Sequence, residues 1–348
     1  MKNRIYTLSL LIGMLLSSVN AIAKETNTQS SFVVPIPSNT WSAPPLQGQF
    51  ADEIRFMILQ NNKYTLNKWY NETKHYLSQT QPYIDFGGTT EHIIRPAAHN
   101  AFTLVVSLQL HVYDASVTNV PEKQAWDITQ RLIRSLAFRH KANSPEGGWG
   151  DQWQSALWAS QVAQAAWLIW DKLPDRDREL VSRMVVHEAD RFNNYTVPYY
   201  RDLDGNILSK GDTKAEENAW NSNVLAIATA MMPSHKHYDR WIQKLIELQL
   251  SAHATPEDTK KTTLVDGVAL QQVLNGSNLN SDGTVVNHDI IHPDYMSTFM
   301  HNVINGWMYK LGGKEVLQSS LYNGKLVYDA LSQREYNGKT MYVKTDNG

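Results

Sequence analysis

The feature that most constrains the fold is a succession of helical segments joined by links that are alternately short and long. From residue 51 onward, apolar residues recur at the three- and four-residue spacing of a helix face, and no alternation is long enough for a substantial sheet. A short β-hairpin is expected at 199–208, around Asp204-Gly205. The expected helices cover 51–60, 64–78, 98–115, 121–139, 151–172, 176–193, 213–231, 236–252, 294–310 and 314–333. The chain is therefore expected to be all-α.

The two kinds of link predict how these helices are arranged. Helices joined by a short link form an antiparallel hairpin, and alternate connections of such hairpins lie at opposite ends. The long links are 79–97, 140–150, 194–212 and 253–293. They are expected to gather at one end, which is where a site would be built. Such hairpins curl into a closed ring or an open solenoid. We expect an α/α toroid, an incomplete barrel of about five hairpins counted from the helix caps.

The first residues have the pattern of a bacterial signal peptide. A basic start with Lys2 and Arg4 precedes the apolar run Leu8–Val19 and the small-residue cleavage site Ala21-Ile22-Ala23. The apolar run is too short to span a membrane comfortably. We therefore expect residues 1–23 to be removed, and the protein to be periplasmic or secreted without stable membrane insertion.

The remainder divides into two parts. Residues 24–48 are polar and proline-rich, and are expected to form an extended lead-in. Residues 49–348 are expected to form one α/α-toroid domain, truncated at its C-terminus. The formal net charge of -2 argues against a nucleic-acid partner, which requires a basic face. The 11 Trp and 16 Tyr suit a large core, and some of them are expected to stack on sugar rings.

Four polar and aromatic clusters lie at the expected N-termini of the helices that follow the long links. They are 95–100, 147–153, 212–221 and 288–295. Because these N-termini share one end of the fold, the clusters are expected to meet there. The candidate substrate-binding residues drawn from them are Arg95, His99, Trp149, Gln152, Trp153, Trp220 and His292.

Several of these residues also have purely structural interpretations. Thr213 and Glu216 have the spacing of a helix capping box, as do Asp151 and Gln154, and for Thr213 and Glu216 we favour capping over catalysis. Asn218, Asn221 and Asn223 occupy the first turns of one expected helix, although asparagine is a mediocre helix former. The three asparagines therefore form either hydrogen bonds between helices or contacts with a ligand.

Metal sites are weakly indicated. His288 and His292 have a spacing that suits zinc on a helix, but Pro293 argues against a helix across that interval. Asp202, Asp204 and Asn206 resemble part of a calcium loop and lack its distal glutamate. We expect no metal and no cofactor, with calcium at this loop as the alternative.

Two reactions on polysaccharide suit the clusters. β-Elimination at a uronic acid needs a base for the C5 proton and a donor to the leaving oxygen, which His288 and Tyr295 could share. Glycoside hydrolysis needs two carboxyl groups at a defined separation. The carboxyl candidates are Asp151, Asp212, Glu216, Glu217 and Asp294. The residues leave both reactions open.

A resemblance to a known group of enzymes favours the first reaction. The run Asp282-Gly283-Thr284-Val285-Val286-Asn287-His288, followed by Tyr295, resembles the Asp-Gly-Ser…His…Tyr segment of the chondroitin AC, hyaluronate and xanthan lyases. The run Gly148-Trp149-Gly150-Asp151-Gln152-Trp153 is similar to their Asn-Trp-Trp segment, with Gly where those lyases have Asn. Heparinase-type lyases share the α/α toroid. The resemblance implies that His288 and Tyr295 transfer protons, with Asn218 or Asn221 neutralising the substrate carboxylate.

The sequence thus predicts a secreted enzyme that cleaves an acidic, uronic-acid-containing polysaccharide by β-elimination. Tyr295 and His288 are the expected catalytic pair, and Arg95 is expected to help Asn218 or Asn221 hold the carboxylate. An α/α-toroid glycoside hydrolase is the main alternative. A non-catalytic glycan-binding toroid and a helical solenoid for protein contacts are the others.

Overall fold

In the computed structural model the chain is mostly helical, as the sequence predicts. The structure describes residues 28–37, 40, 47–333, 335–336 and 339–340, so the expected signal peptide lies outside the described residues. The longer helices are α2 (Gln49–Lys63), α3 (Glu91–Gln109), α5 (Glu122–Phe138), α6 (Ser155–Leu168), α7 (Asp175–Asp190), α8 (Ala215–Met231), α9 (Tyr238–Ala252), α12 (Met300–Leu311) and α13 (Gly324–Gln333).

The remaining elements are short. They include α4 (Ala115–Thr118), α10 (Leu270–Val273) and α11 (Pro293–Ser297). Each strand in the described part of the chain has two residues, and each pairs with one antiparallel neighbour. The pairs are β1 (Leu264–Val265) with β2 (Val268–Ala269), β3 (Val286–Asn287) with β4 (Ile290–Ile291), and β5 (Glu335–Tyr336) with β6 (Lys339–Thr340).

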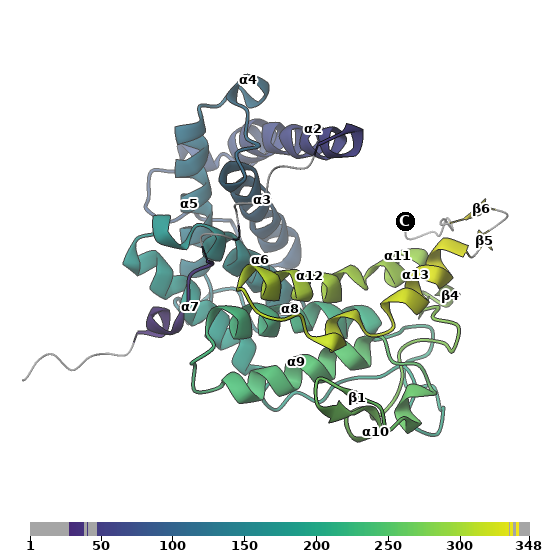
Figure 1. The fold of residues 1–348 in the computed structure, drawn as a ribbon. Coiled ribbons are helices and arrows are strands. Elements are labelled where there is room, and N and C mark those ends of the chain that lie inside the picture. Colours follow the sequence, from purple (N-terminus) through teal and green to yellow (C-terminus); the bar gives the residue numbers. More distant parts are fainter. Residues whose placement is uncertain (1–27, 38–39, 41–46, 334, 337–338, 341–348) are drawn as a thin grey trace, which may run out of the picture.

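Four helices pack side by side in chain order. α3 packs against α6, α6 against α8, and α8 against α12 (Figure 1). The second helices of the hairpins lie against this row, with α5 on α3, α7 on α6 and α9 on α8. The four helices of the row are the ones that follow the long links.

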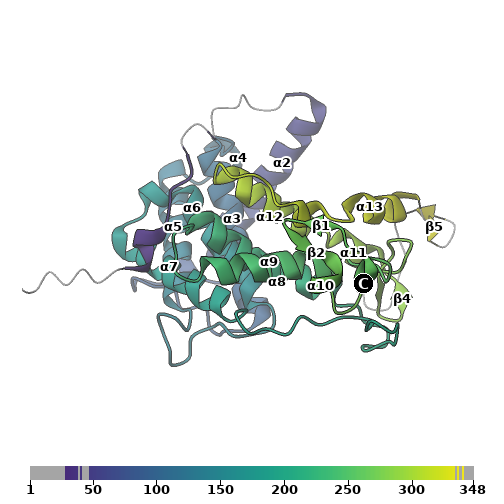
Figure 2. The same cartoon turned by 60° about the horizontal axis from the view of Figure 1, so that its bottom comes forward.

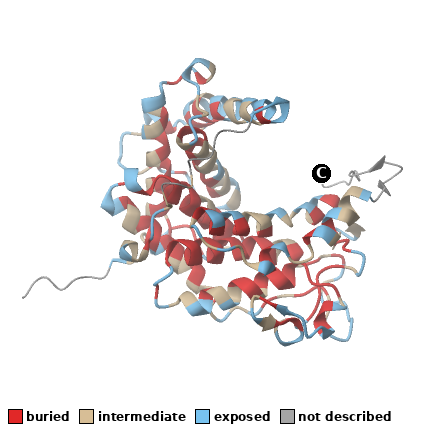
Figure 3. Ribbon diagram, in the orientation of Figure 1, coloured by how far each residue is buried: buried red, intermediate tan, exposed pale blue. Residues whose placement is uncertain are grey.

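The core lies along α6 and α8, as the burial colouring shows (Figure 3). Almost every residue of both helices is buried. Their sequences are rich in alanine, which lets neighbouring helices approach closely, and the large side chains of Trp158 and Trp167 are buried in the core. A helix that is buried on nearly all sides must be surrounded by other elements, and these two are.

Several helix boundaries differ from the expected ones. α3 begins at Glu91 and contains Pro96, so the cluster 95–100 lies inside the helix instead of at its start. α6 begins at Ser155, because Asp151 has a left-handed backbone (φ 57°) and forms no capping box with Gln154. The expected helix 294–310 is divided into α11 and α12.

The long loops after α7 and α9 pack on each other at one end of the molecule. The chain leaving α7 runs alongside α8 to reach the end where β4 and α11 lie (Figure 2). There Arg201 and Ser277 exchange backbone hydrogen bonds, and Thr213 N–H donates to Val286 O. The hairpin expected at 199–208 is reduced to a single bridge between Arg201 and Ile207.

The N-terminal lead-in is not wholly extended. Residues Gln29–Phe32 form a 3₁₀ turn. The following residues bind the helical body, since Val34 N–H donates to Met231 O and Trp167 Nε1–H donates to Val34 O. Within the residues that the structure describes, no helix combines the length and the apolar character needed to cross a bilayer.

Candidate functional site

A cavity of about 590 Å³ lies where three of the four sequence clusters meet. Its walls come from the loop before α6, the start of α8, the β3–β4 hairpin and α11. Its volume is typical of small-molecule sites. The lining residues are Trp153, Lys210, Gly211, Asp212, Thr213, Lys214, Glu216, Glu217, Trp220, Asn287, His288, Asp289 and Tyr295.

His288 reaches the cavity from a tight turn. It forms the turn between β3 and β4 with Asp289, and both have positive φ (51° and 62°), as the two central residues of a type I′ hairpin do. Asp289 N–H donates to Gly211 O, which fixes the turn against the preceding loop. Gly211 has a positive φ (70°), which favours glycine, and a Cβ there would lie 2.1 Å from Asp289 Oδ1 and displace the Asp289 side chain. Non-glycine residues in this conformation are strained, and such strain is common at functional sites.

Tyr295 comes to the same place from α11. Pro293 occupies the first turn of that helix, as predicted. The Tyr295 hydroxyl lies 3.2 Å from His288 Nε2, and the two rings are 5.5 Å apart at 78°. Burial raises the pKa of Tyr295, and the nearby Glu216 and Asp212 raise it further. The hydroxyl is therefore held in its protonated form at neutral pH.

Glu216 is the carboxyl group that the sequence interpretation misjudged. The predicted capping box is not formed, because the N-cap of α8 is Lys214, although Thr213 Oγ1 accepts from Ala215 N–H. The Glu216 side chain instead lines the cavity. Burial, followed by repulsion from Asp212, raises its pKa to about 7. An acid with this pKa is half protonated near neutral pH, which suits proton transfer or a hydrogen bond to an anion.

The three tryptophans expected to bind sugar rings differ in their exposure. Trp153 is 57% exposed, and its ring stands perpendicular to Trp220 with centroids 4.6 Å apart. Trp220 is buried except where it meets the cavity. Trp149 was wrongly assigned to sugar binding, because it is fully buried and its indole N–H donates to Leu136 O. It belongs to the core.

The asparagines of α8 serve the packing of helices. Asn218 is fully buried and its Nδ2 donates to Pro198 O and Ser251 Oγ. Asn221 is also buried and lies beside Tyr195. Neither lines the cavity, so their assignment to a substrate carboxylate was wrong. Asn223 likewise joins α8 to α12. Of the two interpretations, hydrogen bonding between elements of the fold is the one observed.

The other predicted binding residues are not among those that line this cavity. His292 is buried at the first position before α11, with its ring 4.9 Å from that of Tyr295. Burial lowers its pKa, and its side chain makes no capping bond. Gln152 is held by its backbone, whose carbonyl accepts from Arg191 and Ser155. Arg95 and His99 line a separate cavity.

A buried ionic cluster behind the Trp153 loop was not foreseen. The fully buried Glu188 carboxylate accepts from Ser155 Oγ (3.0 Å), Asp151 N–H (3.2 Å) and Arg191, and lies 3.0 Å from His140 Nε2. Burial disfavours its charge, but His140 and Arg191 outweigh that effect and lower its pKa. The sequence did carry a signal, because Glu188 continues the buried stripe of α7.

In the loop considered for calcium, the Asp202 carboxylate accepts hydrogen bonds from within the loop. Asp202 accepts hydrogen bonds from Asp204 N–H and from the backbone and side chain of Asn206. Across the part of the chain that the structure describes, no three His, Cys, Asp or Glu side chains are placed to share a metal ion.

Comparison of the chain with models of protein families, with curated proteins and with solved structures finds no match. The chemistry of the cavity is therefore inferred from its own residues. It combines a Tyr–His pair at hydrogen-bond distance, a carboxyl group that titrates near neutral pH, two lysines and an exposed tryptophan.

Proposed function

We propose that this chain is an exported carbohydrate-active enzyme that cleaves an acidic, uronic-acid-containing polysaccharide by β-elimination. The observation that supports this most directly is the 3.2 Å contact between Tyr295 Oη and His288 Nε2, within a cavity whose walls include Trp153 and Trp220. An α/α toroid, left incomplete, is the architecture we propose for the helices. The ordered packing of α3, α6, α8 and α12 supports it.

The raised pKa of Tyr295 assigns the two proton-transfer roles. A tyrosine that stays protonated suits the acid, and His288, whose Nε2 lies at hydrogen-bond distance from it, is left as the base. His288 removes the C5 proton of the uronic acid, the electron pair forms the C4–C5 double bond, and the C4–O bond breaks. Tyr295 gives its proton to the leaving oxygen. The resulting imidazolium and phenolate are hydrogen-bond neighbours, so one proton transfer between them restores the starting state.

The substrate carboxylate must be stabilised for its C5 proton to become acidic. Asn218 and Asn221 cannot do this from their buried positions. Lys210 lines the cavity, and within the described residues it has no ion-pair partner. Protonated Glu216 can donate a hydrogen bond to the same group. We propose that Lys210 and Glu216 bind the substrate carboxylate.

The direct test of this function is product chemistry. Incubation with hyaluronan, chondroitin sulfate, polygalacturonate and alginate is expected to give, with at least one polymer, an ultraviolet chromophore from the C4–C5 unsaturated uronate. Boiled protein is the control. Release of new reducing ends without the chromophore would contradict β-elimination and indicate hydrolysis.

Glycoside hydrolysis is the second candidate, and a specific observation favours it. Glu216, with a pKa of about 7, and the neighbouring Asp212 could act as general acid and second carboxylate. Carboxyl groups also outnumber lysines in the cavity, which suits a neutral sugar. In that reaction Tyr295 would position the substrate.

Glu216 provides a pH test common to both reactions. Since the fold raises its pKa from 4.5 to about 7, folding favours the protonated form. That contribution to stability is present below pH 4.5 and is lost as the pH rises through about 7. We expect the carboxyl-carbon NMR signal of Glu216 to titrate with a midpoint of about 7, and to be missing in Glu216→Gln.

The same substitution should flatten the decline in stability between pH 4.5 and 7. Glu72→Gln, at an exposed glutamate paired with Lys68, is the matched control and should leave the decline unchanged. A Glu216 midpoint near 4.5, its ordinary value, would contradict the environment described above.

A further inference from the structure

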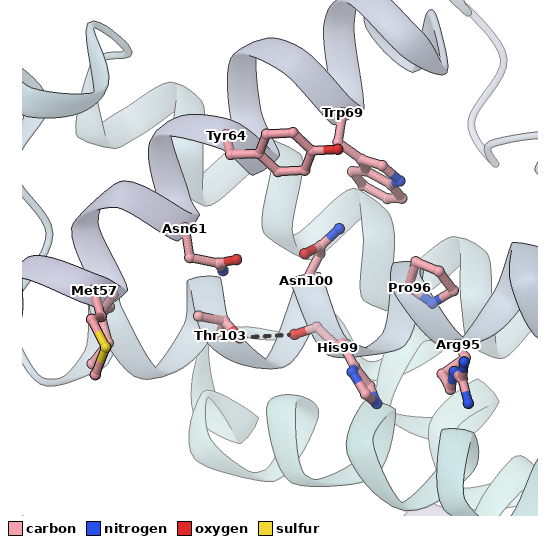
Figure 4. Close-up of a pocket in the computed structure, with 10 residues that line it drawn as sticks. Met57, Asn61, Tyr64, Trp69, Arg95, Pro96, His99, Asn100 and Thr103 are labelled. Carbon is pink, nitrogen blue, oxygen red and sulfur yellow. Dashed lines mark hydrogen bonds between the residues drawn. The ribbon is translucent and has the colours of Figure 1, made fainter. Parts of the chain in front are cut away.

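A second cavity, of about 630 Å³, lies between α2 and α3. Its floor is the exposed side of α3, with Arg95, His99 and Asn100, and its opposite wall comes from Asn61 and Tyr64 (Figure 4). Tyr64 begins a π-helical segment, Tyr64–Thr73, that continues α2. Such segments are rare and are frequent at functional sites.

The side chains of this cavity are of the kind that bind sugars. Tyr64 is 56% exposed, so much of its side chain is accessible to a ligand. Asn61 is exposed and makes no side-chain hydrogen bond with any described residue. Asn100 accepts from Thr65 Oγ1, which leaves its amide nitrogen for a ligand. An aromatic face beside free amide groups matches the apolar face and hydroxyl rim of a sugar ring.

Arg95 connects this cavity to the candidate site. Its Nη1 donates to Gln154 Oε1 at 3.3 Å, and Gln154 is the neighbour of Trp153 in the chain. Its charge also acts on Glu216, lowering the pKa that burial raises. Arg95 is paired with Glu91 on one side and lines the second cavity on the other. The guanidinium therefore lines the second cavity and lies within electrostatic reach of Glu216 in the first.

We propose that the cavity between α2 and α3 is a second subsite of the same enzyme, which binds a further sugar of the polymer. Arg95 contacts an acidic substituent at the junction, and Tyr64 with Asn61 holds the distal ring. The chain then recognises an extended oligosaccharide and binds a disaccharide much less tightly. This inference rests on the proposed function for its substrate class, while its binding test stands apart from turnover.

The test measures affinity by calorimetry in a Tyr295→Phe background, using hyaluronan and polygalacturonate octasaccharides and the corresponding disaccharides. Tyr64→Ala is expected to weaken octasaccharide binding about tenfold, equivalent to about 1.4 kcal/mol, and to leave disaccharide binding unchanged. Asn61→Ala should act in the same direction. Tyr328→Ala, at an exposed tyrosine of α13, is the matched control and should change neither affinity.

The outcomes separate this subsite from the reaction. Weakened octasaccharide binding in Tyr64→Ala supports the subsite even if no polymer is cleaved. Equal losses for both lengths, unchanged octasaccharide affinity, or no binding of either octasaccharide would overturn it. Thermal unfolding of each variant, expected to match the parent because Tyr64 and Asn61 are exposed, excludes misfolding as the cause.

Discussion

Tyr295→Phe is expected to slow turnover by about 10²- to 10⁴-fold, the usual contribution of a positioned acid or base. The substitution removes the proton given to the leaving oxygen and keeps the ring. That ring packs against a small core of Leu279, Val285, Met296 and Val327, so the fold should be retained. Polymer affinity should change little, because the hydroxyl already has a partner in His288. Initial rates and equilibrium binding of the same polymer measure both effects.

Tyr328→Phe, on the exposed surface of α13, is the control and should leave the rate unchanged. The result also discriminates among the classes of function. A non-catalytic glycan-binding protein would show no turnover to lose and unchanged binding. A hydrolase in which Glu216 and Asp212 perform the chemistry would lose far less rate in Tyr295→Phe than in Glu216→Gln. Rates for Tyr295→Phe within about threefold of the parent would rule out its role as the acid.

Glu188→Ala is expected to lower the free energy of unfolding by about 3–5 kcal/mol, the usual cost of removing one partner from a buried charge pair. The loss leaves Arg191 and the buried His140 and Ser155 without their shared acceptor. Chemical denaturation measures the change. Glu72→Ala, at an exposed pair with Lys68, is the control and should cost less than about 0.5 kcal/mol.

The same variant should loosen the loop that carries Trp153. Asp151 N–H donates to Glu188, and Arg191 donates a hydrogen bond to the carbonyl of Gln152. We therefore expect the Asp151 amide proton to exchange faster under conditions where the variant remains folded. A loss of stability below about 1 kcal/mol, or unchanged exchange at Asp151, would show that the cluster does not hold this loop.

Local patterns in the sequence predicted much of the secondary structure. The spacing of apolar residues located α5, α7 and α9 to within a few residues, because one stripe of each helix is buried, and α8 was located equally well although nearly all of it is buried. The start of α3 was misplaced because Pro96 was assigned to the loop before the helix, whereas the helix already extends back to Glu91. Pro293 was correctly predicted to lie in the first turn of a helix, because the loop before it does not form a helix.

Tertiary context decided what individual polar and aromatic residues do. Trp149 and Trp153 flank the same glycine-rich turn, yet one is fully buried and the other 57% exposed. Glu216 looked like a helix cap, and its burial, together with its position beside Asp212, raises its pKa to about 7. The Asn218 side-chain amide donates hydrogen bonds to Pro198 and Ser251, which come from other parts of the chain, and so is not available to a ligand.

The sequence by itself determined that this chain is helical and which loops carry its chemical groups, because apolar periodicity and turn residues act over short distances along the chain. It also placed His288 and Tyr295 close together, seven positions apart across one hairpin and one helix start. Only the tertiary structure decided which side chains share their cavity. Burial and electrostatic environment depend on residues distant in sequence, such as Trp153, Lys210 and Glu216, that meet when the long loops pack against one another.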